Sequence, residues 1–274
     1  MIAREVERFL LYALLAVGVV LTLAPFLWML SASVMPTGEA SSYPPRLVPS
    51  EFTLAHYEDL FTRLNLARYF FNSILIASGI TLISLLINSL AGYAFAKLAF
   101  AGRERIFRIL LSALVIPAQV SMLPLFLMLK QIGLINTWWG VIVPGMASVF
   151  GIFLIRQYAL SIPDSLLEAA RIDGAGEFKI YWLVMLPICR PILVTLAIFT
   201  FMSAWNDFMW PLIVLTDEAM YTLPVALANL LGEHVQDTEL MMAGSVVTIL
   251  PVMLLFIFVQ RAYIDGITAG SLKE

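Results

Sequence analysis

Six long apolar runs constrain this chain more than any other feature of its sequence. The hydrocarbon core of a bilayer is about 30 Å thick, so a helix needs roughly 20 apolar residues to cross it. Hydrophobic residues make up 61% of the chain and charged residues 13%, which is too apolar for a water-soluble domain. The sequence therefore predicts an all-α integral membrane protein with six transmembrane helices. The runs cover residues 9–33, 69–96, 109–129, 138–155, 187–215 and 241–259.

Prolines fall within several of these runs. In a packed membrane bundle, neighbouring helices can satisfy the carbonyl groups that a proline leaves without a partner. We therefore expect kinked helices at these positions and not broken ones. The prolines concerned are Pro25, Pro117, Pro124, Pro144 and Pro251.

Lysine and arginine predict the orientation. If the N-terminus is inside, twelve of the sixteen basic residues fall on the inner face and four on the outer face, in agreement with the positive-inside rule. Both termini are then cytoplasmic. The first apolar run exceeds the roughly 7–15 residues of a signal-peptide core, so we expect a retained anchor. For the outer loops 34–68 and 216–239, a solvated connection and a docking surface for an outside partner remain equal alternatives.

Several kinds of chemistry are missing from the sequence. A phosphate-binding P-loop needs a glycine followed by lysine, and none of the four lysines follows a glycine. The single cysteine excludes a cysteine cluster, and the net charge of -3 lacks the basic field that nucleic acids require. We therefore predict no catalytic residues, no metal site, no cofactor in this chain and no nucleic-acid partner. His56 and His234 are expected to be solvated residues of the outer loops.

Asp207 is the one candidate for a charged residue deep in the membrane. Twenty residues of helix after Pro187 place it about 30 Å along the fifth run. It lies between Trp205 and Trp210, which suits an aromatic belt at the outer interface. A coupling ion would need a charge near mid-membrane, so this placement argues against an ion-coupled carrier. Gln119, Asn206 and Asp207 are candidates for a translocation path, with hydrogen bonding between helices as the alternative role of the two amides.

The inner loop 157–186 has the pattern of a helix, a turn and a second helix. Ser161 is the expected N-cap, and Gly174 is expected to stop the first helix because glycine readily adopts a left-handed conformation. The second helix, residues 177–185, leads directly into the fifth run. The pattern predicts a compact projection that fits a partner's groove. The alternative is an amphipathic helix on the membrane surface.

Within this loop, Glu168-Ala-Ala-Arg-Ile-Asp-Gly-Ala175 resembles the EAA loop of the permease subunits of ABC importers. Three further passages resemble the carbohydrate-uptake branch of that family, which is the maltose-transporter-like type I group. They are Pro117-Ala-Gln119, Trp205-Asn-Asp-Phe-Met-Trp-Pro211 and Gly266-Ile-Thr-Ala-Gly270. The similarity covers nearly the whole chain. One departure is Val184, where the family's consensus has isoleucine.

The resemblance implies that residues 1–274 form one transmembrane permease domain with a cytoplasmic tail at 264–274. The chain would be a multi-pass transport subunit of the bacterial cytoplasmic membrane and not an enzyme. Its substrate would be a sugar or oligosaccharide, or a polyol or sugar phosphate. A stand-alone secondary carrier of neutral solutes remains the alternative.

The resemblance also implies partners. They are a second homologous permease that completes a heterodimer, an ABC ATPase dimer that binds ATP and Mg, an extracytoplasmic sugar-binding protein and membrane lipid. Coupling to the ATPase is implied for Glu168, Ala169, Ala170, Asp173, Gly174 and Ala175.

Overall fold

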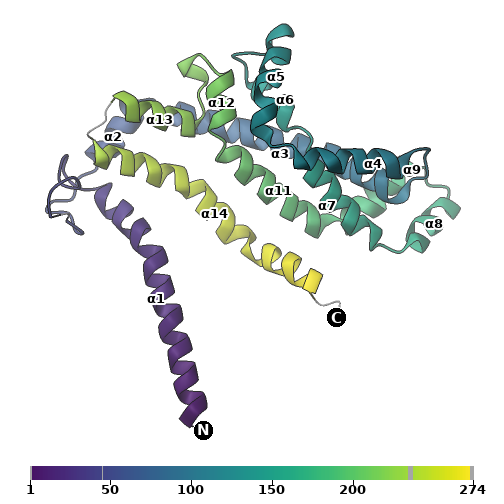
Figure 1. Cartoon of the computed structure of the whole chain (residues 1–274), viewed down its shortest axis with the longest axis horizontal. Coiled ribbons are helices and arrows are strands. Elements are labelled where there is room, and N and C mark those ends of the chain that lie inside the picture. Colours follow the sequence, from purple (N-terminus) through teal and green to yellow (C-terminus); the bar gives the residue numbers. More distant parts are fainter. Residues whose placement is uncertain (1, 45, 234–236, 272–274) are drawn as a thin grey trace. The chain divides into compact units, whose positions relative to one another are not determined.

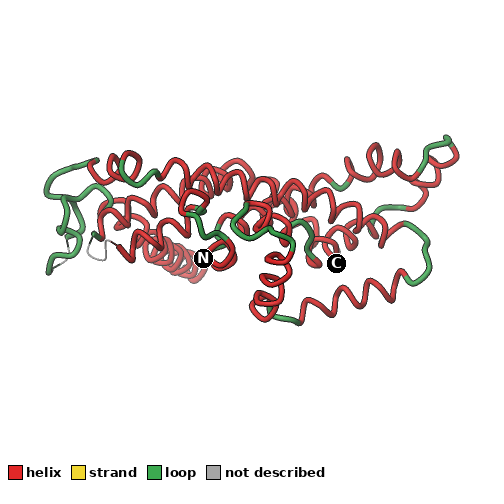
Figure 2. Tube along the Cα trace, turned by 90° about the horizontal axis from the view of Figure 1, so that it is seen from above, coloured by secondary structure: helices red, strands yellow, loops and turns green. Residues whose placement is uncertain are grey.

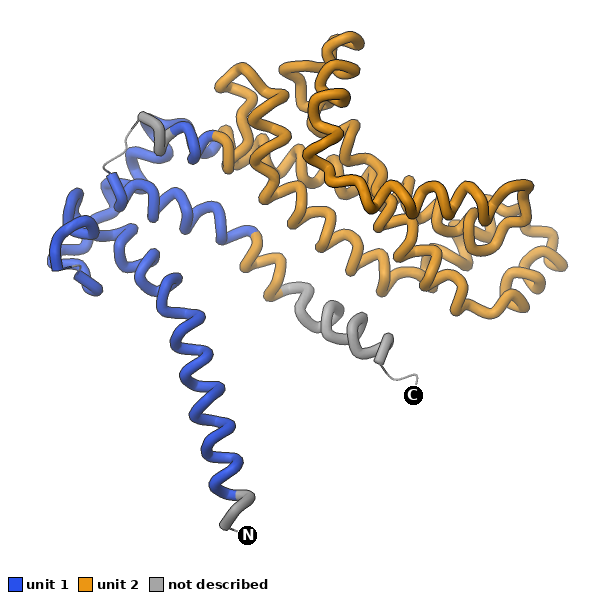
Figure 3. The backbone as a smooth tube through the Cα atoms, in the orientation of Figure 1, with its two compact units in different colours: residues 1–67, 226–251 blue, residues 68–225, 252–274 orange. Residues whose placement is uncertain are grey.

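The computed structural model describes residues 2–44, 46–233 and 237–271, and their regular elements are all helices (Figure 2). Side chains are described for residues 5–44, 46–229 and 237–257. His234 and the side chains of the resembling passage 266–270 therefore lie outside the described residues. The chain forms two compact units, residues 1–67 with 226–251 and residues 68–225 with 252–274 (Figure 3).

Figure 1 labels the α-helices in chain order. They are α1 (Ile2–Ala32), α2 (Ala55–Thr62), α3 (Leu66–Lys97), α4 (Arg103–Ser112), α5 (Ala118–Gln131), α6 (Trp138–Gly145), α7 (Val149–Leu160), α8 (Asp164–Ile172), α9 (Glu177–Ile180), α10 (Leu186–Ile188), α11 (Arg190–Trp205), α12 (Met209–Val214), α13 (Leu223–Glu233) and α14 (Thr238–Ser271).

Four helical stretches are long and apolar enough to cross a membrane, and the described residues contain up to six spans if two bent helix pairs each count as one. The four are Glu5–Ala32, Leu66–Lys97, Trp138–Leu160 and Thr238–Ile257. The bent pairs are α4 with α5 and the α9–α10 stretch with α11. The all-helical membrane fold is confirmed. The orientation of the termini stays a prediction.

The expectation of kinked helices is wrong at Pro117. Pro25, Pro124, Pro144 and Pro251 do lie inside helices. Between α4 and α5, however, the chain turns by 105°. Ile116 is extended there, with φ −81° and ψ 119°, because a residue before proline is disfavoured in the helical region.

The fifth predicted span is also interrupted. The stretch from α9 to α10 includes a π-helical segment, Tyr181–Met185, and it meets α11 at 79°. Helix α11 ends at Trp205, and three residues separate it from α12. The expectation of one helix across residues 187–215 is therefore wrong. Pro187 and Pro191 flank the bend, and each lacks the N–H that a continuous helix would use.

In unit 1, α1 is exposed along its whole apolar window. The segment after it folds back onto α2, where His56 is 4% exposed. Its Nε2 lies 2.9 Å from the Met35 carbonyl, so this nitrogen carries the proton and donates. The expectation of a solvated His56 is therefore wrong, because burying the residue is offset by this hydrogen bond.

In unit 2, α3 lies against α6 and α7. A Cβ on Gly92 would lie 2.6 Å from Ile155 Cγ2, so the missing side chain lets α3 and α7 approach closely. Asn88 is fully buried, and its Oδ1 accepts the N–H of Ser148 at the start of α7 at 3.0 Å. This pairing of polar groups gives α3 and α7 one defined register.

Candidate coupling site and translocation path

The inner loop folds as the sequence predicts, except at its start. Helix α8 begins at Asp164, with Pro163 at the N-cap position. Ser161 is not the N-cap, because its hydroxyl donates to the Tyr158 carbonyl at 2.7 Å and so ends α7. A serine between two helices can cap the end of the first or the start of the second. Here Ser161 caps the end of α7.

Gly174 ends α8 with the left-handed conformation expected of it, at φ 80°. The Gly174 N–H donates to the Arg171 carbonyl at 3.0 Å, and the Ala175 N–H donates to the Ala170 carbonyl at 3.0 Å. These two bonds form a Schellman motif, which satisfies the last carbonyls of α8 and reverses the chain within two residues. The turn therefore depends on a residue without a Cβ at position 174.

The predicted coupling residues divide into an exposed set and a packed set. Glu168, Ala169, Asp173 and Gly174 are exposed. Ala170 and Ala175 instead pack against an apolar cluster that contains the buried Leu167, Ile180 and Tyr181. Around the exposed set, Ile172 is 87% exposed and Phe178 is 71% exposed. One side of the loop is thus packed against the rest of unit 2. The other side is exposed and carries large apolar side chains.

Glu177 anchors the two helices of the loop to each other and to α3. Arg171 Nε donates to Glu177 Oε1 at 2.7 Å, and the Tyr93 hydroxyl donates to Oε2 at 2.7 Å. The hydrogen bond from Arg171, followed by that from Tyr93, holds the pKa of the Glu177 carboxyl below its ordinary value. The same ion pair raises the pKa of the Arg171 guanidinium.

Lys97 makes a second anchor at the C-terminal end of α3. Its side chain is 4% exposed, and its ammonium group donates to the Ile162 carbonyl and to Asp164, each at 2.6 Å. The hydrogen bond and charge of Lys97 lower the pKa of the Asp164 carboxyl. Because the burial of an ammonium is costly without partners, these two acceptors fix the start of α8 against α3.

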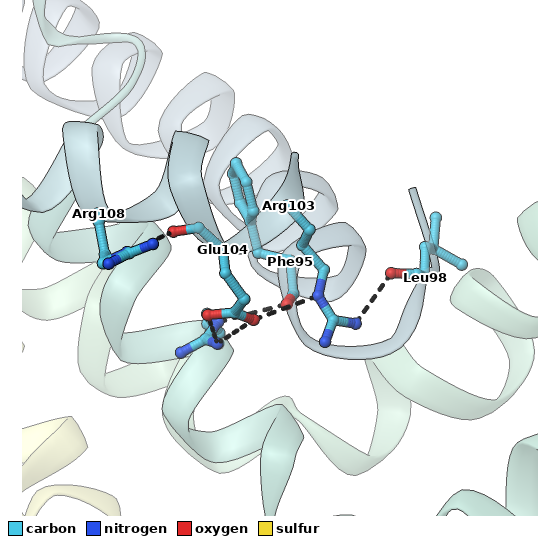
Figure 4. Close-up of polar contacts among 6 residues, drawn as sticks. Phe95, Leu98, Arg103, Glu104 and Arg108 are labelled. Carbon is cyan, nitrogen blue, oxygen red and sulfur yellow. Dashed lines mark hydrogen bonds and ion pairs between the residues drawn. The ribbon is translucent and has the colours of Figure 1, made fainter. Parts of the chain in front are cut away.

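A third group of contacts joins α7 to α4 beside the loop (Figure 4). Arg156 Nη2 donates to Glu104 at 3.1 Å, and its Nε donates to the Phe95 carbonyl at 3.3 Å. The same guanidinium lies 4.1 Å from the centre of the Phe107 ring. Arg103 Nε also donates to Glu104, at 3.3 Å. The ends of α3, α4 and α7 are therefore held together by one arginine.

The three candidates for the translocation path lie in two places. Gln119 is exposed in the first turn of α5, whereas Asn206 and Asp207 follow α11. Asn206 is exposed and donates to the Met202 carbonyl of its own helix at 2.8 Å. Asp207 is half-buried, and its Oδ1 accepts the Trp210 N–H at 3.4 Å. A role for these residues in the path stays a prediction.

The expected aromatic belt around Asp207 is wrong. Trp205 is 1% exposed, and Trp210 is 7% exposed. The Trp210 indole donates to the Gly140 carbonyl at 3.1 Å. Both rings are therefore buried within unit 2 and do not form an exposed belt. Among the described residues, no group of three histidine, cysteine, aspartate or glutamate side chains is placed to hold a metal.

The sequence did not reveal the anchors of the loop. Tyr93 and Lys97 lie in or beside the predicted second span, far in sequence from the residues that they bind. One weak signal exists, since Arg171 and Glu177 are six residues apart with the helix stop between them. A helix reversal at Gly174 brings such a pair together, but no pattern in one sequence identifies Tyr93 as the third member.

A multi-pass helical protein with a projecting helix–turn–helix loop is the class of molecule that these features define. The family model for the inner membrane component of binding-protein-dependent transport systems matches residues 88–267, and the chain belongs to this family. It is therefore a multi-pass transport subunit of the inner membrane and not an enzyme.

Relatives over almost the whole chain support this membership. The arabinooligosaccharides transport system permease protein AraQ of Halalkalibacterium halodurans is 41% identical, over 91% of this chain and 90% of the relative. The diacetylchitobiose uptake system permease protein NgcG of Streptomyces coelicolor is 32% identical, over 96% and 88%. The lactose transport system permease protein LacG of Rhizobium radiobacter is 30% identical, over 98% of both chains.

Solved structures show the same fold. A chain of a bacterial ABC transporter involved in the import of the acidic polysaccharide alginate matches with a TM-score of 0.85 at 24% identity, over 94% of this chain and 97% of that one. The alginate transporter in complex with its pentasaccharide-bound periplasmic protein contains a chain that matches with a TM-score of 0.67 at 15% identity, over 93% and 94%.

Proposed function

We propose that this chain is the transmembrane permease subunit of an ATP-driven importer that moves a sugar or oligosaccharide inward, a class in which we include polyols and sugar phosphates. The names of its relatives support a carbohydrate, since they transport arabinooligosaccharides, diacetylchitobiose and lactose. The amides of Gln119 and Asn206 and the carboxylate of Asp207 suit a hydroxyl-rich substrate, because each can form hydrogen bonds with hydroxyl groups.

The energy source of this import lies in another chain. No glycine–lysine pair exists in the sequence to form a phosphate-binding loop. ATP and Mg are therefore bound by a partner ATPase dimer. A binding protein on the outer side delivers the substrate, in keeping with the name of the family. A second, homologous permease completes the path, and lipid surrounds the pair.

The ATPase binds the exposed side of the inner loop, which faces away from the apolar cluster. We call this side the coupling surface, and it consists of Leu166, Ala169, Ile172, Gly174 and Phe178. Exposed apolar side chains grouped on one loop are typical of a site for a protein partner. Ala169 and Gly174 are small, so a cleft of the partner can approach the backbone between the larger side chains.

The observation that carries this proposal is the contrast between the two sides of the loop. The coupling surface is exposed, whereas the opposite side is anchored by Glu177 and Lys97 to α3. A partner that moves the coupling surface therefore moves α3 with it, because the anchored loop is not free to swing independently. Glu168 and Asp173 add negative charge beside the surface and orient the partner.

Site-directed cross-linking tests this assignment in native membranes. Cys189 is buried, so a cysteine placed on the surface is the accessible thiol for a bifunctional reagent. We expect Ile172→Cys and Phe178→Cys to cross-link to an ATPase that mass spectrometry identifies by its nucleotide-binding motifs. Phe100→Cys is the matched control, since Phe100 is also exposed but lies between α3 and α4 and is not part of the coupling surface. Equal cross-linking from all three positions, or from none, contradicts the proposal.

Purification through a C-terminal tag gives an independent measure. Under mild solubilisation, we expect an ATPase and a second, non-identical permease to co-purify with this chain. Recovery of this chain alone, under conditions that keep other membrane complexes intact, contradicts an importer and supports a stand-alone carrier.

A further inference from the structure

Helix α3 is hydrogen-bonded at its N-terminal end to the segment that follows α12. The Asn72 amide donates to the carbonyls of Ala219 and Tyr221 at 3.1 and 3.0 Å, and Asn72 itself is 2% exposed. One residue further along, Ser73 Oγ accepts the Leu223 N–H at 2.7 Å. Buried hydrogen bonds to these neighbouring backbone groups fix this segment against α3, since leaving them unpaired is costly.

This segment belongs to the loop 216–239, which the sequence places on the outer face. Its residues 216–221 are held on another side by Asn136, whose Oδ1 accepts the N–H groups of Thr216 and Asp217 at 3.0 and 2.9 Å. The segment is thus an ordered strap with exposed acidic residues at Asp217 and Glu218. Its position and order suit a contact with a partner on the outer side.

At its C-terminal end, α3 is bonded to the inner loop. Tyr93 donates to Glu177, and Lys97 donates to Asp164 and the Ile162 carbonyl. One turn before Tyr93, the Ser89 hydroxyl lies 2.7 Å from the Tyr181 hydroxyl. Figure 1 shows α8 and α9 at this end of α3.

Between these two ends, α3 is one uninterrupted helix of 32 residues without proline. From Asn72 to Tyr93 it spans about 30 Å at a rise of 1.5 Å per residue. Two other spans in residues 68–225 are sharply bent, since α4 and α5 meet at 105° and the α9–α10 stretch and α11 meet at 79°. The span Trp138–Leu160 consists of two helices, α6 and α7, with residues 146–148 between them. In that part of the chain, α3 is therefore the one span built as a single helix, and it joins the outer strap to the inner loop.

We propose that α3 transmits force between the outer strap and the inner loop, with Asn72 and Tyr93 as the positioning residues at its two ends. This inference rests on the proposed function, because it assumes an ATPase on the inner side and a binding protein on the outer side. Docking of the loaded binding protein on the strap shifts α3, and the shift moves the coupling surface toward the geometry that stimulates hydrolysis. Linkage makes the effect reciprocal for binding.

The test uses the complete transporter in proteoliposomes, with its substrate-loaded binding protein. The measured quantity is the ratio of ATPase rates with and without that protein. We expect Tyr93→Phe and Asn72→Ala each to lower the ratio at least about fivefold, the lower end of usual coupling factors. The double variant should be no worse than the single ones, since both residues act on one helix and such effects do not add.

Two substitutions are matched controls. Tyr158→Phe removes a hydroxyl from a tyrosine of the same apolar cluster, and no hydrogen bond of that hydroxyl to the described residues is found. Thr81→Val lies within α3, where the hydroxyl donates to the Ala77 carbonyl of the same helix at 2.7 Å. Both should keep the wild-type ratio, because neither removes a contact at an end of α3.

The outcomes separate this inference from the proposed function. If the wild-type complex assembles and is stimulated, and Tyr93→Phe and Asn72→Ala are stimulated equally, the role of α3 is overturned while the proposed function stands. If the wild-type chain binds no ATPase, the proposed function fails first. A second readout is the affinity of the transporter for the binding protein, measured with and without nucleotide trapped on the ATPase. Trapping should change this affinity in the wild type and leave it unchanged in both variants.

Discussion

The Tyr93 hydroxyl donates a 2.7 Å hydrogen bond to Glu177, a residue 84 positions later in the chain. This bond joins α3, a predicted transmembrane helix, to the first residue of α9 in the inner loop. Because the acceptor is a carboxylate that Arg171 also binds, both bonds are charge-assisted and stronger than neutral ones. The anchor that Tyr93 provides between α3 and the inner loop therefore depends on the ionised state of Glu177.

The first prediction concerns pH. The pKa of Glu177 is lowered in the folded protein, from an ordinary value of 4.5. Its contribution to stability is therefore fully present above pH 4.5 and is lost as the pH falls through the lower folded pKa. We expect about 0.5–1 kcal/mol, as for other partly exposed ion pairs. A spin label at Phe178→Cys should become more mobile as the pH falls through that lower folded pKa.

The matched control for this experiment is Glu177→Gln. With this substitution the label should be mobile at neutral pH and should change little on acidification. A label at Phe100→Cys should report no comparable change in either background. If the Phe178→Cys label is equally mobile at neutral pH with and without Glu177→Gln, the carboxylate is ruled out as the anchor.

The second prediction concerns Gly174. Its φ of 80° disfavours any residue with a Cβ, although no atom lies within 4 Å of the position that the Cβ would take. Gly174→Asp should strain the turn by roughly 1 kcal/mol and add a charge to the coupling surface. We expect normal membrane insertion, loss of the bound ATPase and uncoupling of hydrolysis from uptake.

Gly174→Asn separates strain from charge, since asparagine tolerates the left-handed conformation better than other residues. It should retain more ATPase and more uptake than Gly174→Asp in membrane vesicles. Normal uptake by Gly174→Asp would falsify the assignment of this turn to the coupling site.

The third prediction tests the close packing of α3 on α7. A Cβ at position 92 would lie 2.6 Å from Ile155 Cγ2 and 3.1 Å from the Arg156 backbone nitrogen. Gly92→Ala should therefore push the two helices apart and cost about 1–3 kcal/mol, as overpacking does elsewhere. Gly79→Ala is the control on the same helix, because its Cβ would make an ordinary 3.4 Å contact with Ile142.

Thermal unfolding of the two variants in detergent gives the measurement. Gly92→Ala should have the lower midpoint, and Gly79→Ala should stay close to the wild type. If both variants match the wild type, α3 and α7 are less tightly packed than the structure indicates.

The sequence predicts those parts of the fold that depend on local patterns. Apolar runs predict where the helices lie, and the positive φ of Gly174 follows from a helix that must stop and reverse. Breaks within spans are harder to predict. Pro117 and Pro124 look alike in sequence, yet α5 begins after the first and continues through the second. Which proline breaks a helix depends on how neighbouring helices satisfy the backbone, and one sequence does not contain that information.

The site is predictable to a similar extent. The EAA block predicts where the proposed coupling residues lie in the inner loop, because they are consecutive in the sequence. The anchors Tyr93 and Lys97 are not predictable, since a tyrosine and a lysine near the end of an apolar span are also typical of the membrane interface. The tryptophans beside Asp207 illustrate the same ambiguity. An aromatic belt and a buried ring differ in tertiary packing and not in composition.

The fourth prediction tests whether the charge of Asp207 drives transport. In an importer powered by a separate ATPase, this residue is not a proton carrier. Asp207→Asn keeps an oxygen that can accept the Trp210 N–H, so the local structure should remain. We expect the variant to retain uptake within about tenfold of the wild type, with the same dependence on ATP, since a hydrogen bond that weakens when the carboxylate becomes an amide contributes about 1 kcal/mol at most. Uptake in vesicles without ATP, driven by an imposed pH gradient in the wild type and abolished in Asp207→Asn, would instead identify a secondary carrier with Asp207 as its working charge.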